Sequence, residues 1–91
     1  MTIAVQTLIS GRVQGAYYRG WTEEQAVTRG LSGWVTNNPD GTVSALFIGP
    51  DAAVQEMLVA CRYGPPAARV DAVETTVLDP VPTSAGFRVR R

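Results

Sequence analysis

Apolar residues recur along this chain in short runs separated by turn-forming residues, and each run predicts one element of secondary structure. Residues 3–9 are mostly apolar and β-branched, which predicts a buried strand, either face of which could point to the core. Residues 18–29 predict a helix that ends at Gly30. The apolar stripe expected on this helix consists of Tyr18, Trp21, Ala26 and Val27.

A hairpin is predicted in the middle of the chain. Residues 32–37 and 42–48 have the composition of strands, and they are joined by Asn38-Pro39-Asp40-Gly41. In that join proline presets φ and glycine supplies a positive φ, which is typical of a turn between antiparallel strands. The side chains expected to face inward are Val43, Ala45 and Phe47.

The clearest amphipathic pattern predicts a second helix. Val54, Met57, Leu58 and Cys61 follow one another at the i, i+3, i+4, i+7 spacing of a single helix face. We expect Asp51 to be the N-cap of this helix, since a carboxylate there can accept from the first free N–H groups. Residues 64–66, Gly-Pro-Pro, end it.

Two further strands are predicted toward the end of the chain. Residues 69–78 form the fourth strand, and its apolar phase shifts between Val70 and Val73, which indicates a β-bulge. Residues 79–82 predict a loop, and residues 86–90 a short last strand.

This order of elements predicts an α+β fold of the ferredoxin-like type. The sequence runs βαββαβ with a short C-terminal strand added, and we expect an antiparallel sheet with two helices on one face, an α/β sandwich. Each split βαβ unit is expected to cross over in the right-handed sense. Because this fold serves many functions, the function has to be argued from the site.

The bulk composition limits the classes of function. The 91 residues make one domain, residues 1–91, since a second core would not fit, and 45% hydrophobic residues suffice for one core. The formal net charge of zero argues against a nucleic-acid partner. No apolar run approaches ~18 residues, so we expect no membrane partner and no transmembrane segment. Nothing demands an oligomer, and we expect a monomer.

The residue types that are missing exclude several chemistries. All eight basic residues are arginines, so lysine Schiff bases and Walker-type loops are excluded. The absence of histidine excludes the usual catalytic triads and most catalytic zinc sites, and we expect neither a metal nor a cofactor. Cys61 is the single cysteine, which fits a reducing cytoplasm, and residues 1–5 do not resemble a signal peptide. The expected localisation is therefore cytoplasmic.

The strongest candidate for chemistry is the segment Gly11-Arg12-Val13-Gln14-Gly15-Ala16-Tyr17-Tyr18-Arg19. It leads from a strand through a glycine turn into a helix, and free N–H groups at a helix start bind anions, most often phosphate. The Arg19 guanidinium adds a planar fork that matches two phosphate oxygens. A lone Gly-x-x-x-Arg would favour a structural strand-to-helix turn with a solvated arginine. The predicted phosphate-binding residues are Gln14, Gly15, Ala16, Tyr17, Tyr18 and Arg19.

The same segment resembles the signature of the acylphosphatase family, Gly-x-Val-Gln-Gly-Val-x-Phe-Arg. Only Ala16, for valine, and Tyr18, for phenylalanine, depart from it. A second family block, Gly-Trp-Val-x-Asn-x-x-Asp-Gly-x-Val, is matched throughout by residues 33–43. Two blocks at the usual separation are far more specific than one, and weaker matches extend the resemblance over nearly the whole chain.

The resemblance implies an enzyme that hydrolyses the carboxyl–phosphate bond of acyl phosphates. It also implies that water attacks phosphorus directly, without a metal or a phosphoenzyme, and that the partner is a small-molecule acyl phosphate. On the same resemblance we expect Arg19 to bind and orient the phosphate and Asn37 to orient the water. From spacing alone Asn37 would be a turn-flanking residue that caps the hairpin. Its carboxamide has a donor and an acceptor, so it can hold a water and contact the substrate, but it cannot act as a base. The expected site holds no histidine, lysine or well-placed carboxylate, which suits an activated substrate.

Other classes of function make different demands on the same residues. The alternative is a catalytically silent regulatory module that binds phosphate or acyl phosphate. An RNA-binding module should display several aromatics on its central strands, and the third strand offers only Phe47. A cysteine-dependent phosphatase would need a thiol where Val13 stands. Tyr17 and Tyr18 could line an acyl-group pocket, with at least one of them in the core.

Overall fold

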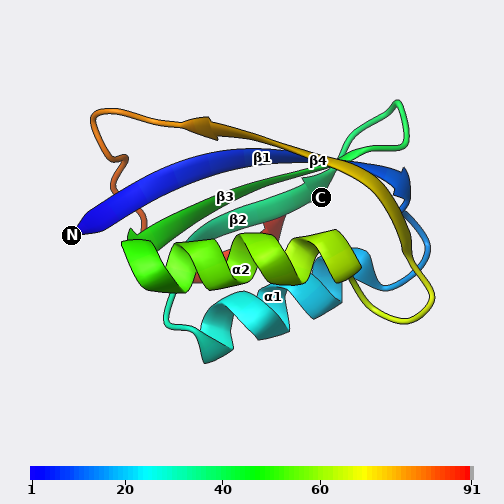
Figure 1. Cartoon of the computed structure of the whole chain (residues 1–91), viewed down its shortest axis with the longest axis horizontal. Coiled ribbons are helices and arrows are strands. Elements are labelled where there is room, and N and C mark those ends of the chain that lie inside the picture. Colours follow the sequence, from blue (N-terminus) through cyan, green and yellow to red (C-terminus); the bar gives the residue numbers. More distant parts are fainter. Residues whose placement is uncertain (91) are drawn as a thin grey trace.

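Residues 1–90 are described by a computed structural model, in which a five-stranded sheet carries both helices on one face (Figure 1). This is the ferredoxin-like arrangement that the sequence predicts, and its element order is confirmed. The elements are β1 (Thr2–Arg12), α1 (Tyr18–Thr28), β2 (Ser32–Asn37), β3 (Val43–Pro50), α2 (Asp51–Tyr63), β4 (Arg69–Val77) and β5 (Phe87–Arg90). None of the helices within residues 1–90 combines the length and the apolar character needed to cross a membrane.

The sheet order is β4-β1-β3-β2-β5. β1 pairs antiparallel with both β3 and β4, and β2 and β3 form the predicted antiparallel hairpin. The short strand β5 lies parallel to β2 at one edge, so the sheet is mixed there. β5 extends the sheet beside β2, and Asn37, the last residue of β2, therefore lies near this edge.

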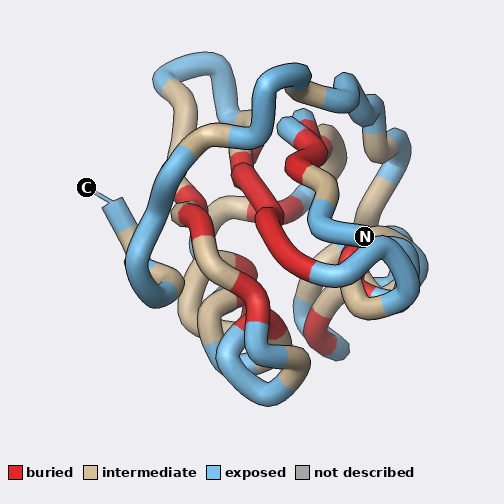
Figure 2. The backbone as a smooth tube through the Cα atoms, turned by 90° about the vertical axis from the view of Figure 1, so that its left-hand side faces the viewer, coloured by how far each residue is buried: buried red, intermediate tan, exposed pale blue. Residues whose placement is uncertain are grey.

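The core lies between the sheet and the two helices, and buried positions gather in the interior strands (Figure 2). The predicted inward positions Val43, Ala45 and Phe47 are all fully buried. The stripe on α2 is confirmed as well, since Val54, Met57 and Cys61 are buried and Leu58 packs against them. In β1, Val5 and Ile9 face this core, which settles the face that the sequence left open.

The predicted bulge is present where β1 meets β4. Ser10 pairs with Ala72 and Gly11 with Val70, which leaves Asp71 as the extra residue. The backbone of β4 comes so close to Gly11 that a Cβ there would overlap the Arg69 carbonyl oxygen. A glycine is therefore required at the point where the register shifts.

Two local expectations are wrong. Asp51 is the first residue of α2 rather than its N-cap, because Pro50 already provides the extended backbone, φ −58° and ψ 141°, that precedes a helix. The Asp51 carboxylate accepts instead from Gln55 Nε2 at 3.3 Å. Val27 is 60% exposed, and Thr22 is buried in its place, since its hydroxyl donates to the Tyr18 carbonyl oxygen at 2.7 Å.

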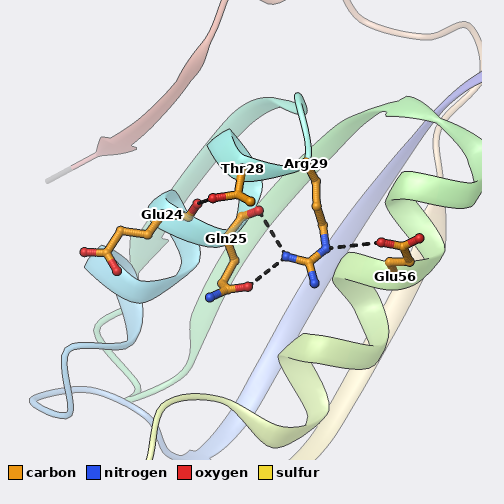
Figure 3. A network of polar contacts seen from close by, with 5 residues as sticks. All are labelled: Glu24, Gln25, Thr28, Arg29 and Glu56. Carbon is orange, nitrogen blue, oxygen red and sulfur yellow. Dashed lines mark hydrogen bonds and ion pairs between the residues drawn. The ribbon is translucent and has the colours of Figure 1, made fainter.

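The C-terminal end of α1 is fastened to α2 by Arg29 (Figure 3). Its Nη1 donates to the backbone oxygen of Gln25 at 3.2 Å and to the side-chain oxygen of the same residue at 2.7 Å. Its Nε lies 3.7 Å from a carboxylate oxygen of Glu56 on α2. At the opposite end of α1, Arg19 has no such bonds within residues 1–90, and the candidate site lies there.

Candidate active site

A pocket of about 760 Å³ lies where the loop after β1 and the start of α1 meet the ends of β2 and β5. The loop and the helix contribute most of its wall, and β2 contributes Asn37. Figure 1 shows the loop after β1 at the same end of the sheet as the β2–β3 turn. The two sequence blocks that resemble the family signature are thus brought together in space.

The backbone of the loop after β1 contains left-handed residues. Gly15 has φ +76°, and Tyr17 has φ 61° and ψ 23°, so left-handed residues interrupt the approach to α1. Successive N–H groups in such a turn point to one side and form a concave donor surface. Within the described residues 1–90, no protein oxygen accepts from the N–H groups of residues 15–20. The first helical bond is that from Trp21 N to Tyr17 O at 2.9 Å.

The two predicted catalytic side chains both line this pocket. Arg19 is half-buried and, within the part of the chain that the structure describes, forms neither an ion pair nor a hydrogen bond. Asn37 is also half-buried, and its carboxamide has no hydrogen-bond partner in residues 1–90. A cation and an amide are therefore both free to contact the same ligand.

Asn38 contrasts with its neighbour. Its amide nitrogen donates to the hydroxyls of Thr42 and Ser44, each at 2.8 Å. These bonds stabilise the turn between β2 and β3, which agrees with the interpretation of Asn38 as a turn residue. Of the two consecutive asparagines, only Asn37 has a free carboxamide at the pocket.

Two of the predicted phosphate-binding residues, Gln14 and Ala16, do not line the pocket. Gln14 donates from Nε2 to the backbone oxygens of Asn38 at 2.7 Å and Thr42 at 2.8 Å, which ties the loop to the hairpin. Ala16 is buried, and neither it nor Gln14 belongs to the pocket wall. The N–H of Ala16 stays within the run of free donors, whereas the Gln14 side chain has a structural task.

The two adjacent tyrosines separate into a core residue and a pocket residue. Tyr18 is 1% exposed, and its hydroxyl donates to the Cys61 carbonyl oxygen at 2.7 Å, near the C-terminal end of α2. Burial raises the pKa of Tyr18 well above its usual range, so the phenol stays neutral. Tyr17 is 64% exposed and lines the pocket.

Sequence reasoning missed the carboxylate of Glu23, and the expectation that none lies near the site is wrong. Glu23 is one helical turn after Arg19, so the spacing on the predicted helix was the signal that could have found it. Within residues 1–90, no ion pair joins it to Arg19. It brings negative charge to a pocket whose other charged groups are arginines.

The strand β5 contributes Arg88 and Val89 to the wall, which the sequence did not indicate. Phe87 and Val89 pack against the core, so strand alternation directs the Arg88 side chain toward the opposite face. Arg90 lies on that face as well, with its guanidinium 4.9 Å from the centre of the Trp34 ring. We therefore assign Arg88 to the rim of the pocket.

The remaining candidate groups carry no chemistry at this site. Cys61 lies in the core, and burial raises the pKa of its thiol to about 12, so it stays protonated. In the described part of the chain, no three His, Cys, Asp or Glu side chains lie together as a metal-binding group would require. The candidate groups that remain at this pocket are Arg19, Asn37 and the loop N–H groups.

Comparison with known proteins adds an independent line of argument. The family model described as Acylphosphatase matches residues 5–89. An acylphosphatase of Rhodospirillum rubrum is 60% identical over 79 residues, which are 87% of this chain and 86% of that protein. An acylphosphatase of Azorhizobium caulinodans is 48% identical over 89 residues, 98% of this chain and 96% of that one. The crystal structure of acylphosphatase from Bacillus subtilis superimposes with a TM-score of 0.95 at 30% identity, covering 98% of this chain and 99% of its own.

Proposed function

The chain belongs to the acylphosphatase family and is a hydrolase of acyl phosphates, and we propose that the pocket between the β1–α1 loop and β2 is its active site. One observation carries the proposal: a free arginine, a free carboxamide and a run of unpaired N–H groups share one pocket. Each supplies what hydrolysis of an acyl phosphate needs.

Arg19 and the backbone of residues 15–20 bind the phosphoryl group. The guanidinium donates two parallel hydrogen bonds to phosphate oxygens, and the N–H groups surround the others. The start of α1 adds roughly half a positive charge. All of these donors are fixed before substrate arrives, so they stabilise the charge of the transition state without reorganising.

Asn37 orients the attacking water. Its carbonyl oxygen accepts a hydrogen bond from the water, while its NH₂ group donates to the substrate. The water oxygen forms a bond to phosphorus, and the bond from phosphorus to the carboxyl oxygen breaks. The carboxylate leaves with the electron pair, and a phosphate oxygen takes the proton of the water. No protein base is needed because a phosphate oxygen takes the proton, and no metal ion is needed because the carboxylate leaves as a stable anion and Arg19 and the N–H groups stabilise the phosphoryl charge.

The wider setting of the enzyme follows from the same residues. We propose that residues 1–91 act as a single domain, as a monomer and in the cytoplasm, without a nucleic-acid partner. The net charge of zero and the single, buried cysteine support this setting. Light scattering on a size-exclusion column measures the mass, and a mass twice that of the chain would contradict the monomer.

The proposed activity is tested by hydrolysis of benzoyl phosphate in the presence of EDTA, with the wild type beside Arg19→Gln. We expect fast turnover by the wild type alone. In H₂¹⁸O the label should enter inorganic phosphate and not benzoate, and acid quenching should trap no phosphoenzyme. A trapped phosphoenzyme would refute direct attack by water. A folded wild type that binds phosphate without turnover would instead be the catalytically silent binding module.

A further inference from the structure

Tyr17 adopts a backbone conformation that is unfavourable for a tyrosine. Among residues 1–90 it is the only residue other than glycine with a positive φ, 61°, and it stands immediately before α1. A bulky residue stays in the left-handed region only where its surroundings hold it there. The neighbouring N–H groups of residues 15–20 depend on this turn for their direction. The surroundings of the Tyr17 side chain therefore decide the shape of the phosphate loop.

The Tyr17 side chain lies along the first turns of α1 and contacts this helix at two points. Its ring lies directly over Gly20: a Cβ at that position would overlap the ring, whose three nearest carbons would all be 2.9 Å away or closer. Its hydroxyl donates to Glu24 Oε2 at 2.6 Å. This hydrogen bond, together with the Glu24 charge, raises the pKa of Tyr17, so the hydroxyl remains a donor. The ring is thus clamped although it is 64% exposed.

We propose that Tyr17 is a positioning residue for phosphate binding, and that Gly20 and Glu24 hold it in place. The clamp of Tyr17, Gly20 and Glu24 fixes the left-handed turn, and the turn points the loop N–H groups at the phosphate. Gly20 is a glycine because the tyrosine ring occupies the space of its Cβ. The inference rests on the proposed function of the pocket, but phosphate binding alone can test it.

A positioning role differs from a contact with the acyl group, which Tyr17 could also make because it lines the pocket. If Tyr17 positions the N–H groups, its loss weakens the binding of inorganic phosphate, acetyl phosphate and benzoyl phosphate by the same factor. If its ring only packs against the acyl group, its loss weakens the binding of benzoyl phosphate and leaves the binding of inorganic phosphate unchanged. The two roles therefore separate by ligand.

The test places Gly20→Ala in two backgrounds. In the wild type the new methyl group displaces the ring, and we expect inorganic phosphate, titrated in ¹⁵N NMR spectra, to bind roughly tenfold more weakly, since small misplacements at such sites are costly. In Tyr17→Gly the ring is absent, so Gly20→Ala should change the phosphate Kd no further. There it should raise the Tm, because alanine is a better helix former than glycine.

The conservative variant Tyr17→Phe keeps the ring and removes its hydrogen bond, so we expect a loss of phosphate affinity smaller than that of Tyr17→Gly. Tyr63→Phe is the matched control, since Tyr63 is 77% exposed and lies at the end of α2. It should bind phosphate like the wild type.

The inference would be overturned if Gly20→Ala bound phosphate as tightly as the wild type. It would also be overturned if Gly20→Ala lowered the phosphate affinity equally in both backgrounds. Neither result would contradict hydrolysis by the wild type. A wild type that binds no phosphate would overturn the inference as well. If the wild type binds phosphate, loses affinity on Gly20→Ala and hydrolyses nothing, the clamp stands and the proposed catalytic function fails.

Discussion

Each end of helix α1 carries an arginine, and the two arginines differ in whether they have bonding partners. At the N-terminal end Arg19 has no partner within residues 1–90, and the N–H groups before it are unpaired. At the C-terminal end Arg29 is bonded to Gln25 and faces Glu56 (Figure 3). The backbone N–H groups of residues 29–31 all donate to carbonyls of α1.

This difference supports the proposal that the N-terminal end of α1 binds the ligand. A helix leaves its first N–H groups without internal partners, and a protein normally satisfies them with a capping side chain or with water. Here Tyr17 stands at the N-cap and caps nothing with its side chain. In the proposed function these donors bind an anion, whereas at the far end Arg29 is bonded to Gln25 and its Nε faces Glu56 of α2. The proposal therefore gives the two arginines of this helix different roles, binding for Arg19 and stability for Arg29.

The largest expected effect is that of Arg19→Gln. It should lower kcat/KM by roughly a thousandfold, since one donor at a charged transition state is worth about 10²–10³ and a cation is lost as well. Arg19→Lys should also lose most activity, because an ammonium has no planar fork. The Tm should stay that of the wild type, since Arg19 has no partner to lose. A fully active Arg19→Lys in steady-state kinetics would contradict the bidentate contact.

The two asparagines of the hairpin repeat the contrast between a free and a bonded group. Asn37→Ala should lower kcat roughly a hundredfold and leave the fold intact, because its carboxamide is free. Asn38→Ala should leave kcat nearly unchanged and cost about 1 kcal/mol of unfolding free energy, since it loses bonds to Thr42 and Ser44. Equal losses of kcat in the two variants would contradict this division of roles.

At the other end of α1, Arg29→Met should reverse the pattern of Arg19. It removes the bonds to Gln25 and the charge facing Glu56 but keeps the aliphatic stem. We expect a loss of about 1–2 kcal/mol in urea unfolding, with kcat/KM unchanged. A stable variant with reduced activity would show that the two ends of the helix are not independent.

The smallest effect is expected for Glu23→Gln. The Glu23 carboxylate lines the pocket and repels an anionic substrate, so its neutralisation should raise kcat/KM about two- to fivefold at low salt and less at high salt. A general base would behave in the opposite way. A loss of a hundredfold or more, with a changed pH profile, would identify Glu23 as the base and contradict substrate-assisted attack.

The features that the sequence could predict are local. The hairpin strands follow from Asn38-Pro39-Asp40-Gly41, the buried face of α2 from its helical spacing, and the β-bulge from the shifted phase near Val70. Each of these features depends on residues close together in the chain, so the sequence pattern is enough to predict it. The prediction of the candidate site is local as well, because each of its two blocks is contiguous in the sequence.

The features that sequence reasoning missed depend on tertiary contacts. Thr22 is buried because its hydroxyl bonds to a carbonyl of its own helix, and a hydrophobic pattern assigns that position to solvent. Arg88 reaches the pocket wall only because β5 pairs with β2 from far along the chain. The exposed position of Tyr17 depends on the space above Gly20. None of these can be derived from spacing alone.

One measurement tests the contrast between the two ends of α1 directly: a titration of the wild type with inorganic phosphate, followed in ¹⁵N-HSQC spectra. The amide signals of residues 15–20 and the Arg19 side chain should shift and saturate together, while those of residues 28–31 stay in place. Arg19→Gln should abolish the shifts, and Arg29→Met should not. Shifts centred on residues 28–31, or no saturable shift at residues 15–20, would contradict the assignment of the phosphate site to the start of this helix.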